Sequence, residues 1–189
     1  MRPFVIDDRP RLCIGVRFAP GFVRAAFGLP ASELLDQRVD YDLVYSHADA
    51  DLDGIRAAAS DAERVAGGFA LARRRFRSAA RVPSGVRAAV AYIVAAQGNV
   101  RVGSLAECIG VTRQHLARQF AAHVGMTAKQ FARVKRAEAA RARAVTARAA
   151  HPRQVQWSSI ALQAGYYDQA HFISDVKALT GVTPTRWIG

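Results

Sequence analysis

The strongest constraint on the fold is a pattern of small, capping and turn residues that occurs twice in the second half of the chain. Residues of the segment 104–127 recur in the segment 159–183, at an offset of 55 residues that becomes 56 after the turn. The matched pairs are Ser104 and Ser159, Ala106 and Ala161, Gly110 and Gly165, His115 and His171, Gly125 and Gly181, and Thr127 and Thr183. Self-similarity of this kind indicates two copies of one supersecondary unit.

Each copy predicts a short helix, a turn that contains glycine, and a second helix, which is the helix-turn-helix pattern. In the first copy Ser104, followed three residues later by Glu107, predicts a helix start. Gly110 permits the left-handed backbone of a tight turn. Thr112 can cap the second helix, which we expect to end near His123.

The second copy carries the same signals and follows a long Arg-rich segment. We expect helices over 158–165 and 168–181, with Asp168 as the cap of the latter. A helix over 127–147, capped by Thr127, is expected to join the two units. Apolar side chains at helical spacing predict the buried faces, which are Leu105, Ile109, Val111, Leu116 and Phe120 in the first unit and Ile160, Ala164, Tyr166, Phe172 and Val176 in the second.

Charge separates the two halves of the chain. Residues 1–80 hold 12 Lys and Arg against 11 Asp and Glu, whereas residues 81–189 hold 15 against 4. Of the 27 basic residues 24 are Arg, a bias that explains the choice of Arg over Lys but not the scarcity of acids in the second half. A domain of this charge attracts polyanions, of which nucleic acid is the most common.

The outward faces of the second helices carry side chains suited to DNA. Gln114 and Arg118 flank Ala117, and Arg and Gln read guanine and adenine edges in the major groove. In the second unit the outward positions are Ala170, Ser174 and Lys177, and Gln169 and His171 lie on the flanks. A solvated polar face gives the same pattern without a function, and for either helix alone we favour that interpretation. The repeat and the charge together favour DNA.

Two stretches, GVTRQHLARQFAAHVGMTAKQF (110–131) and IALQAGYYDQAHFISDVKALTGVTP (160–184), resemble the two signatures of the AraC/XylS family of transcription regulators. The resemblance covers about residues 84–189. It implies a mainly α, bipartite DNA-binding domain over 81–189, with a first unit at 101–125, a linker helix at 127–147 and a second unit at 158–181. The two recognition helices would enter successive major grooves of double-stranded DNA.

The resemblance also implies functional positions in both units. The base-reading positions are Arg113, Gln114, Ala117 and Arg118 in the first recognition helix and Gln169, Ala170, His171 and Ser174 in the second. Phosphate contacts are implied for Thr112, Thr127, Lys129, Lys177 and Arg186. Many relatives carry a basic residue at Ser174 and at Ala178 and an aromatic one at Val176, so we expect the first helix to supply most of the sequence specificity.

Residues 1–80 predict a small α+β region. The expected elements are a strand over 11–18, short helices over 22–27 and 33–38, an acidic loop over 40–53 and a helix over 52–76. The segment 14–40 resembles the end of the sensor domain of some AraC/XylS regulators, where it follows a cupin-like barrel. We therefore expect the remnant of a sensor, in a shortened regulator or in a sequence that begins late. This region could support a homodimer; the effector is unknown.

The sequence predicts no enzyme. A nucleophile with a neighbouring base and a phosphate-binding glycine loop are both missing. His115 and His171 have no acid or Cys partner spaced for a metal, so no metal, cofactor or catalytic residue is expected. Two distant cysteines and the lack of a membrane span or secretory signal favour the cytoplasm.

The predicted function is that of a sequence-specific DNA-binding transcription regulator, with RNA polymerase as its expected protein partner. Two alternatives remain open. One is a non-specific architectural DNA-binding protein, and the other is a ligand- or partner-binding module without DNA activity.

Overall fold

The computed structural model describes residues 15–44, 48–77, 82–151 and 155–188, and helices are the only regular elements within these ranges. The prediction of a mainly α protein is confirmed. The α+β character expected for the first 80 residues is not found, because residues 15–18 of the expected strand have no regular structure and residues 11–14 lie outside the described ranges. None of the described helices is both long enough and apolar enough to cross a membrane.

The basic half forms the predicted double unit. The first unit consists of α6 (Val102–Ile109) and α7 (Arg113–Val124), preceded by α5 (Ser84–Ala95). The linker helix α8 (Ala128–Ala150) leads to the second unit, α9 (Trp157–Gln163) and α10 (Gln169–Thr180), and α11 (Pro184–Trp187) closes the chain. The linker helix ends three residues later than expected, at Ala150, and the second unit begins one residue earlier.

Local capping chemistry explains most of these boundaries. Thr112 Oγ1 accepts the backbone N–H of His115 at 3.1 Å, and Asp168 Oδ1 accepts that of His171 at 2.7 Å. A capping box at Thr127 begins α8. The helix start expected at Ser104 is wrong, because α6 begins two residues earlier, at Val102. Its N-cap residue, Arg101, makes no side-chain hydrogen bond to the first turn.

The first 80 residues form short helices that differ from the expected ones. They are α1 (Val23–Phe27), the 3-10 turn η1 (Ala31–Glu33), α2 (Tyr41–Val44), α3 (Ala48–Arg56) and α4 (Asp61–Arg77). The helix expected over 33–38 is wrong, since only η1 forms there and Asp36 adopts a left-handed φ of 55°. The acidic loop expected over 40–53 is largely helical, because α2 and most of α3 lie in it.

The single helix expected over 52–76 is also wrong, because it is split into α3 and α4. Ser60 Oγ accepts the backbone N–H of Glu63 at 3.2 Å, and Glu63 Oε2 accepts the N–H of Ala59 at 2.9 Å. This reciprocal cap begins a new helix at Asp61. In α4, a Cβ on Gly67 would lie 3.0 Å from Ile55 Cγ1, so the glycine lets α3 pack closely against α4.

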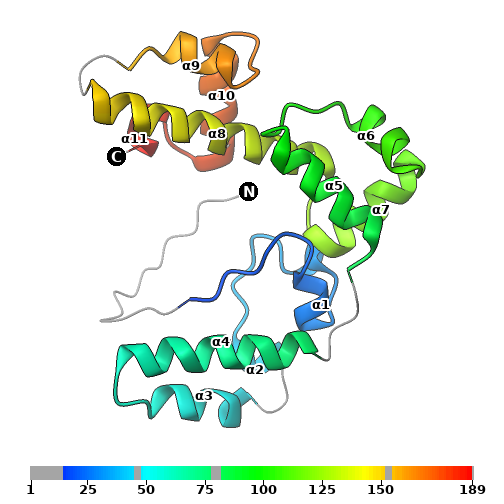
Figure 1. Cartoon of the computed structure of the whole chain (residues 1–189), viewed down its shortest axis with the longest axis vertical. Coiled ribbons are helices and arrows are strands. Elements are labelled where there is room, and N and C mark those ends of the chain that lie inside the picture. Colours follow the sequence, from blue (N-terminus) through cyan, green and yellow to red (C-terminus); the bar gives the residue numbers. More distant parts are fainter. Residues whose placement is uncertain (1–14, 45–47, 78–81, 152–154, 189) are drawn as a thin grey trace.

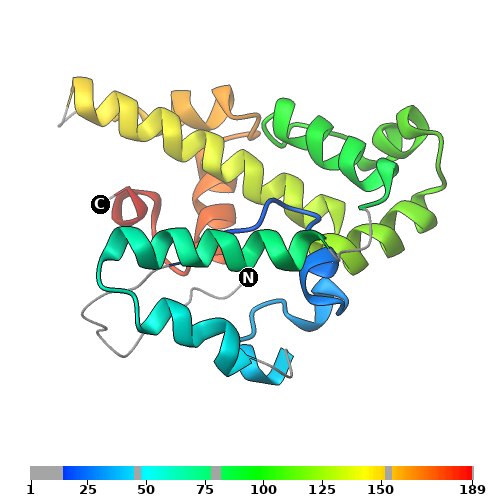
Figure 2. The ribbon, with the colours of Figure 1, turned by 60° about the horizontal axis from the view of Figure 1, so that its bottom comes forward.

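Figure 1 shows two arms joined at one side. One arm carries α8 to α11, the other is the hairpin of α3 and α4, and α1 with α5 to α7 connects them. In Figure 1 α10 crosses α8, and Figure 2 shows α10 and α11 on the side of α8 that faces α4. Each helix-turn-helix unit has its own buried core, and the apolar residues predicted for both cores are buried or packed against them.

A third, smaller cluster joins α1 to the first unit. Ala25 of α1 is buried together with Val82 and Val86, and Phe22 and Val124 pack around them. The turn between α7 and α8 also packs closely against η1, since a Cβ on Gly125 would lie 2.7 Å from the carbonyl oxygen of Ala31. Residues on both sides of position 80 therefore share one core.

Candidate nucleic-acid interface

The helix α7 presents one buried and one exposed face. Leu116 and Phe120 are buried in the core of the first unit. The four positions expected to read bases, Arg113, Gln114, Ala117 and Arg118, are all exposed. Their exposure persists although α1 and η1 pack against α7, because the contacts described above involve its C-terminal end. The described residues of the N-terminal region thus leave open the face expected to meet DNA.

The two arginines of α7 have different surroundings. The guanidinium of Arg113 lies over Gly103, and its Nη2 is 3.9 Å from Glu107 Oε1 in a highly exposed ion pair. Exposed pairs of this kind contribute roughly 0–1 kcal/mol. Arg118 makes no hydrogen bond or ion pair with any other described residue. Its guanidinium is therefore available to a ligand without breaking an internal contact.

The helix α10 presents a comparable exposed face. Gln169, Ala170, His171 and Ser174, the expected base-reading positions of the second unit, are all exposed. Phe172 and Val176 are buried opposite them, as the sequence predicts. The ring of His171 stands edge-on to the ring of Tyr166, with centroids 5.3 Å apart. One candidate base-reading side chain is thus in contact with the core of its unit.

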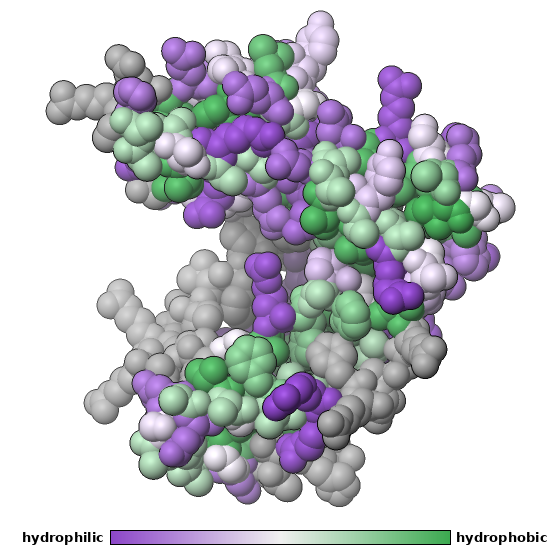
Figure 3. All heavy atoms as spheres, viewed as in Figure 1, coloured by the Kyte–Doolittle hydropathy of each residue, from purple (hydrophilic) through white to green (hydrophobic). Residues whose placement is uncertain are grey.

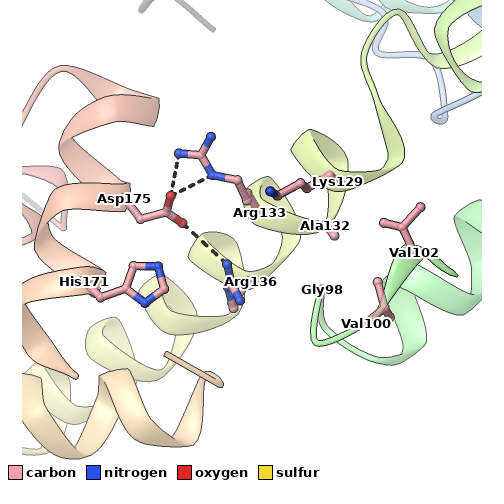
Figure 4. A pocket seen from close by; sticks show the side chains of 9 residues that line it. All are labelled: Gly98, Val100, Val102, Lys129, Ala132, Arg133, Arg136, His171 and Asp175. Atoms are coloured by element: carbon pink, nitrogen blue, oxygen red, sulfur yellow. Dashed lines mark hydrogen bonds and ion pairs between the residues drawn. The ribbon is translucent and has the colours of Figure 1, made fainter. Parts of the chain in front are cut away.

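The structure adds a residue that the sequence analysis did not single out. Asp175 of α10 is buried, with 6% of its surface exposed, and it points to the linker helix (Figure 4). Its Oδ1 accepts the Nε–H of Arg133 at 2.7 Å, and its Oδ2 accepts the hydroxyl of Tyr166 at 3.1 Å. Arg136 Nη2 lies 3.9 Å from Oδ2, and its guanidinium lies 4.6 Å from the centroid of the Tyr166 ring.

These contacts form a polar cluster between the second unit and the linker helix, which we call the Asp175 cluster: Asp175, Tyr166, Arg133 and Arg136. Burial, together with the charge of Asp175, raises the pKa of Tyr166 to about 12. The phenol therefore remains a proton donor to Asp175 at neutral pH. A signal was present in the sequence, because Asp175 precedes the inward Val176 and is one of only 4 acids in the basic half.

The positions expected to contact phosphate are spread over four helices, α7, α8, α10 and α11. Thr112, Lys129, Lys177 and Arg186 are exposed. Thr127 is exposed as well, but its hydroxyl lies 3.0 Å from Gln130 Oε1 and accepts the N–H of Gln130. Thr112 and Thr127 cap successive helices and lie at opposite ends of α7. The two threonines cannot serve the same phosphate.

The two units also touch through the loop 97–99, between α5 and α6. Gly98 has a φ of 79°, and a Cβ there would lie 2.1 Å from the carbonyl oxygen of Ala132 in α8. On one side of it Gln97 Oε1 accepts a hydrogen bond from Arg143 Nη2 at 2.6 Å. On the other side Asn99 lies 3.1 Å from the place of a Cβ on Gly165, in the turn of the second unit.

The surface around the two units is strongly polar. Figure 3 shows hydrophilic side chains gathered over the arm that carries α8 to α11. A cleft of about 450 Å³ lies between the units and is bordered by Lys129, Arg133, Arg136 and His171, with Asp175 as its acid (Figure 4). Among the described residues, no three His, Cys, Asp or Glu side chains are grouped closely enough to hold a metal ion.

Comparison with known proteins identifies the basic half. Residues 105–189, from within α6 to the end of the chain, match the family described as "Helix-turn-helix domain". No curated protein and no solved structure matches the chain. The matched segment contains α7, the linker helix and the whole second unit, which are the elements that carry the exposed faces described above. Residues 105–189 are therefore a DNA-binding helix-turn-helix domain of the AraC/XylS family of transcription regulators.

Proposed function

We propose that the chain is a sequence-specific transcription regulator that places α7 and α10 in two successive major grooves of double-stranded DNA. The observation that carries this proposal is the repeated geometry of the two units. Each presents a second helix with a capped N-terminus, a buried inner face and an exposed outer face, and both are attached to α8. A major groove admits an α-helix of this kind.

The first recognition helix α7 is proposed to supply most of the sequence discrimination. Arg118 has an uncommitted guanidinium, which suits bidentate bonding to guanine. Gln114 can pair with adenine in the same way. Ala117 lies between them and allows a close approach to the bases. Arg113 is the fourth reader, and it would exchange its weak contact with Glu107 for a base or phosphate.

The second recognition helix α10 is proposed to contribute more to positioning. Its exposed side chains at Ala170 and Ser174 are short, and Gln169 and His171 are the longer ones on its first turn. The backbone N–H groups at the N-termini of α7 and α10 suit phosphate binding. The proposed phosphate-binding side chains are Thr112, Thr127, Lys129, Lys177 and Arg186.

The test begins with selection of DNA from a random pool by the purified protein, followed by affinity measurements on the selected site and its single-base variants. Arg118→Ala should weaken the selected site by about 1–3 kcal/mol and relax discrimination at one base pair. The matched control is Arg87→Ala, which removes an exposed positive charge from α5. The control should leave the base preference unchanged.

The outcomes separate the functional classes. If Arg118→Ala weakened every sequence equally, the base-reading role of Arg118 would be wrong. If selection by the wild type enriched no motif, the chain would be an architectural DNA-binding protein. If no DNA bound at physiological salt, a partner-binding module would be the better description. RNA polymerase contact and homodimer formation remain predictions, which pull-down with the polymerase and sedimentation of the free protein would test.

A further inference from the structure

We propose that Asp175 is a positioning residue, which fixes α10 relative to α7 and so determines the spacing of the two DNA half-sites that the protein accepts. The proposal rests on the proposed function, since it concerns how two recognition helices are kept in register. It adds a role for a buried acid whose carboxylate points to the linker helix and not to the exposed face of α10.

The first step is the attachment of α10 to α8. Asp175 is held by Arg133 through two contacts to the same oxygen, Nε–H at 2.7 Å and Nη2 at 2.5 Å. Arg136 lies one helical turn further along α8 and approaches the other oxygen. A buried carboxylate that loses such partners becomes an uncompensated charge, which is strongly unfavourable. A roll or slide of α10 along α8 would separate these groups, so the cluster opposes both motions.

The second step is the link from the cluster to the DNA-facing side of α10. The Tyr166 hydroxyl donates to Asp175, and the Tyr166 ring contacts both Arg136 and His171. His171 is exposed on the first turn of α10, where base contacts are proposed. The same cluster therefore orients the helix and one of its candidate reading side chains.

The third step is the attachment of the first unit to the same part of α8. A Cβ on Gly98 would lie 2.1 Å from Ala132 O and 2.5 Å from the backbone nitrogen of Arg136. Arg136 is thus contacted by the loop of the first unit through its backbone and by the second unit through its side chain (Figure 4). Both units therefore contact the same short stretch of the linker helix, and these contacts restrict changes in the distance between the units.

The consequence for DNA follows from the geometry of the double helix. Ten base pairs advance the groove by about 34 Å, so one inserted base pair moves a half-site by about 3.4 Å and rotates it by about 36°. A rigid pair of recognition helices cannot follow that displacement and loses contacts in one groove. A pair whose second unit can shift on α8 can follow it.

The experiment compares Asp175→Asn with Glu138→Gln. Both changes remove one negative charge with little change in size, but Glu138 is an exposed residue of α8 that pairs with Lys135. Affinities are measured by fluorescence anisotropy for duplexes in which the selected half-sites are moved together or apart by one and two base pairs. Thermal unfolding of each variant is recorded alongside.

We expect wild type and Glu138→Gln to lose about tenfold or more in affinity when the spacing changes by one base pair. Asp175→Asn should lose less than about threefold for the same change, while its base preference within each half-site is retained. If Asp175→Asn does not fold cooperatively, Tyr166→Phe carries the test, since it removes only the hydroxyl that Asp175 accepts. It should shift the spacing profile in the same direction.

A wild-type spacing profile in folded Asp175→Asn, or in Tyr166→Phe where that variant replaces it, overturns the proposal. An equal broadening in Glu138→Gln also overturns it, because net charge would then be the cause. A wild type that selects no motif removes the proposed two-groove function and this inference with it, whereas a wild type that selects two half-sites but tolerates any spacing overturns this inference alone. The wild-type profile alone therefore distinguishes the two failures.

Discussion

Replacing Gly98 by alanine tests the contact that places the loop 97–99 against the linker helix. The backbone of Gly98 has a φ of 79°, and an added Cβ would meet the carbonyl oxygen of Ala132 at 2.1 Å. Gly110 offers a matched comparison, since its φ is 76° and no atom lies within 4 Å of the place of its Cβ. Gly165 is intermediate, with a φ of 83° and the Asn99 side chain 3.1 Å away.

The expected magnitudes differ because two effects combine at Gly98. A left-handed backbone costs a non-glycine residue about 1–2 kcal/mol, and this cost applies equally to the three sites. Overpacking against a rigid backbone adds about 1–3 kcal/mol. Gly98→Ala should therefore lower the free energy of unfolding by about 3 kcal/mol and Gly110→Ala by about 1 kcal/mol. For a chain of this length each kcal/mol corresponds to about 2–4 °C in Tm.

The assay is denaturant and thermal unfolding of the three alanine variants, followed by circular dichroism. The order of stability should be Gly110→Ala, then Gly165→Ala, then Gly98→Ala as the least stable. Gly165→Ala should lie close to Gly110→Ala if the flexible Asn99 side chain moves aside. If Gly98→Ala and Gly110→Ala lost the same stability, the close approach of the loop to α8 would be refuted.

Two further predictions concern the cap of α7 and the buried histidine at its end. Thr112→Ala should lower the free energy of unfolding by about 1 kcal/mol, because the N–H of His115 loses its acceptor. The control Ser158→Ala, in the uncapped first turn of α9, should change the free energy of unfolding little. Equal losses in the two variants would contradict the capping role of Thr112. Burial and, to a smaller extent, the charge of Arg24 in α1 lower the pKa of His123 in the folded protein. As the pH falls, His123 therefore takes up a proton in the unfolded chain before it does so in the folded protein. The free energy of unfolding should accordingly fall as the pH drops below about 6.5. Tm measured between pH 5 and 7.5 should show this slope, and His123→Gln should flatten it; an unchanged slope would exclude His123 as its source.

Short-range chemistry made much of the fold predictable. Thr112, Thr127 and Asp168 cap helices within three residues of themselves, and Gly110 ends α6 with a left-handed φ of 76°. A capping pattern of the same short-range kind also led to a wrong prediction. Serine followed by glutamate three residues later occurs at Ser104, where it caps nothing, and at Ser60, where it starts α4 and divides the helix expected there.

The candidate site was predictable only on its outer side. The exposed positions of α7 and α10 follow from helical periodicity once the buried face is known. Asp175 lies 42 residues from Arg133, and no local pattern connects them. Its burial depends on the angle at which α10 crosses α8, and that angle is a property of the assembled helices. The contact of Gly98 with Ala132 is of the same long-range kind.

The small cluster around Ala25, Val82 and Val86 has a practical consequence for exchanging parts between regulators. A chimaera joined near residue 81 would take the two helix-turn-helix units but leave α1 behind. Val86, which is 1% exposed here, and the Gly125 turn beside η1 would then meet water or an unrelated surface. A transplanted segment that begins before Phe22 keeps α1 and η1 packed on the first unit. The better position at which to divide the chain therefore lies within its first 80 residues.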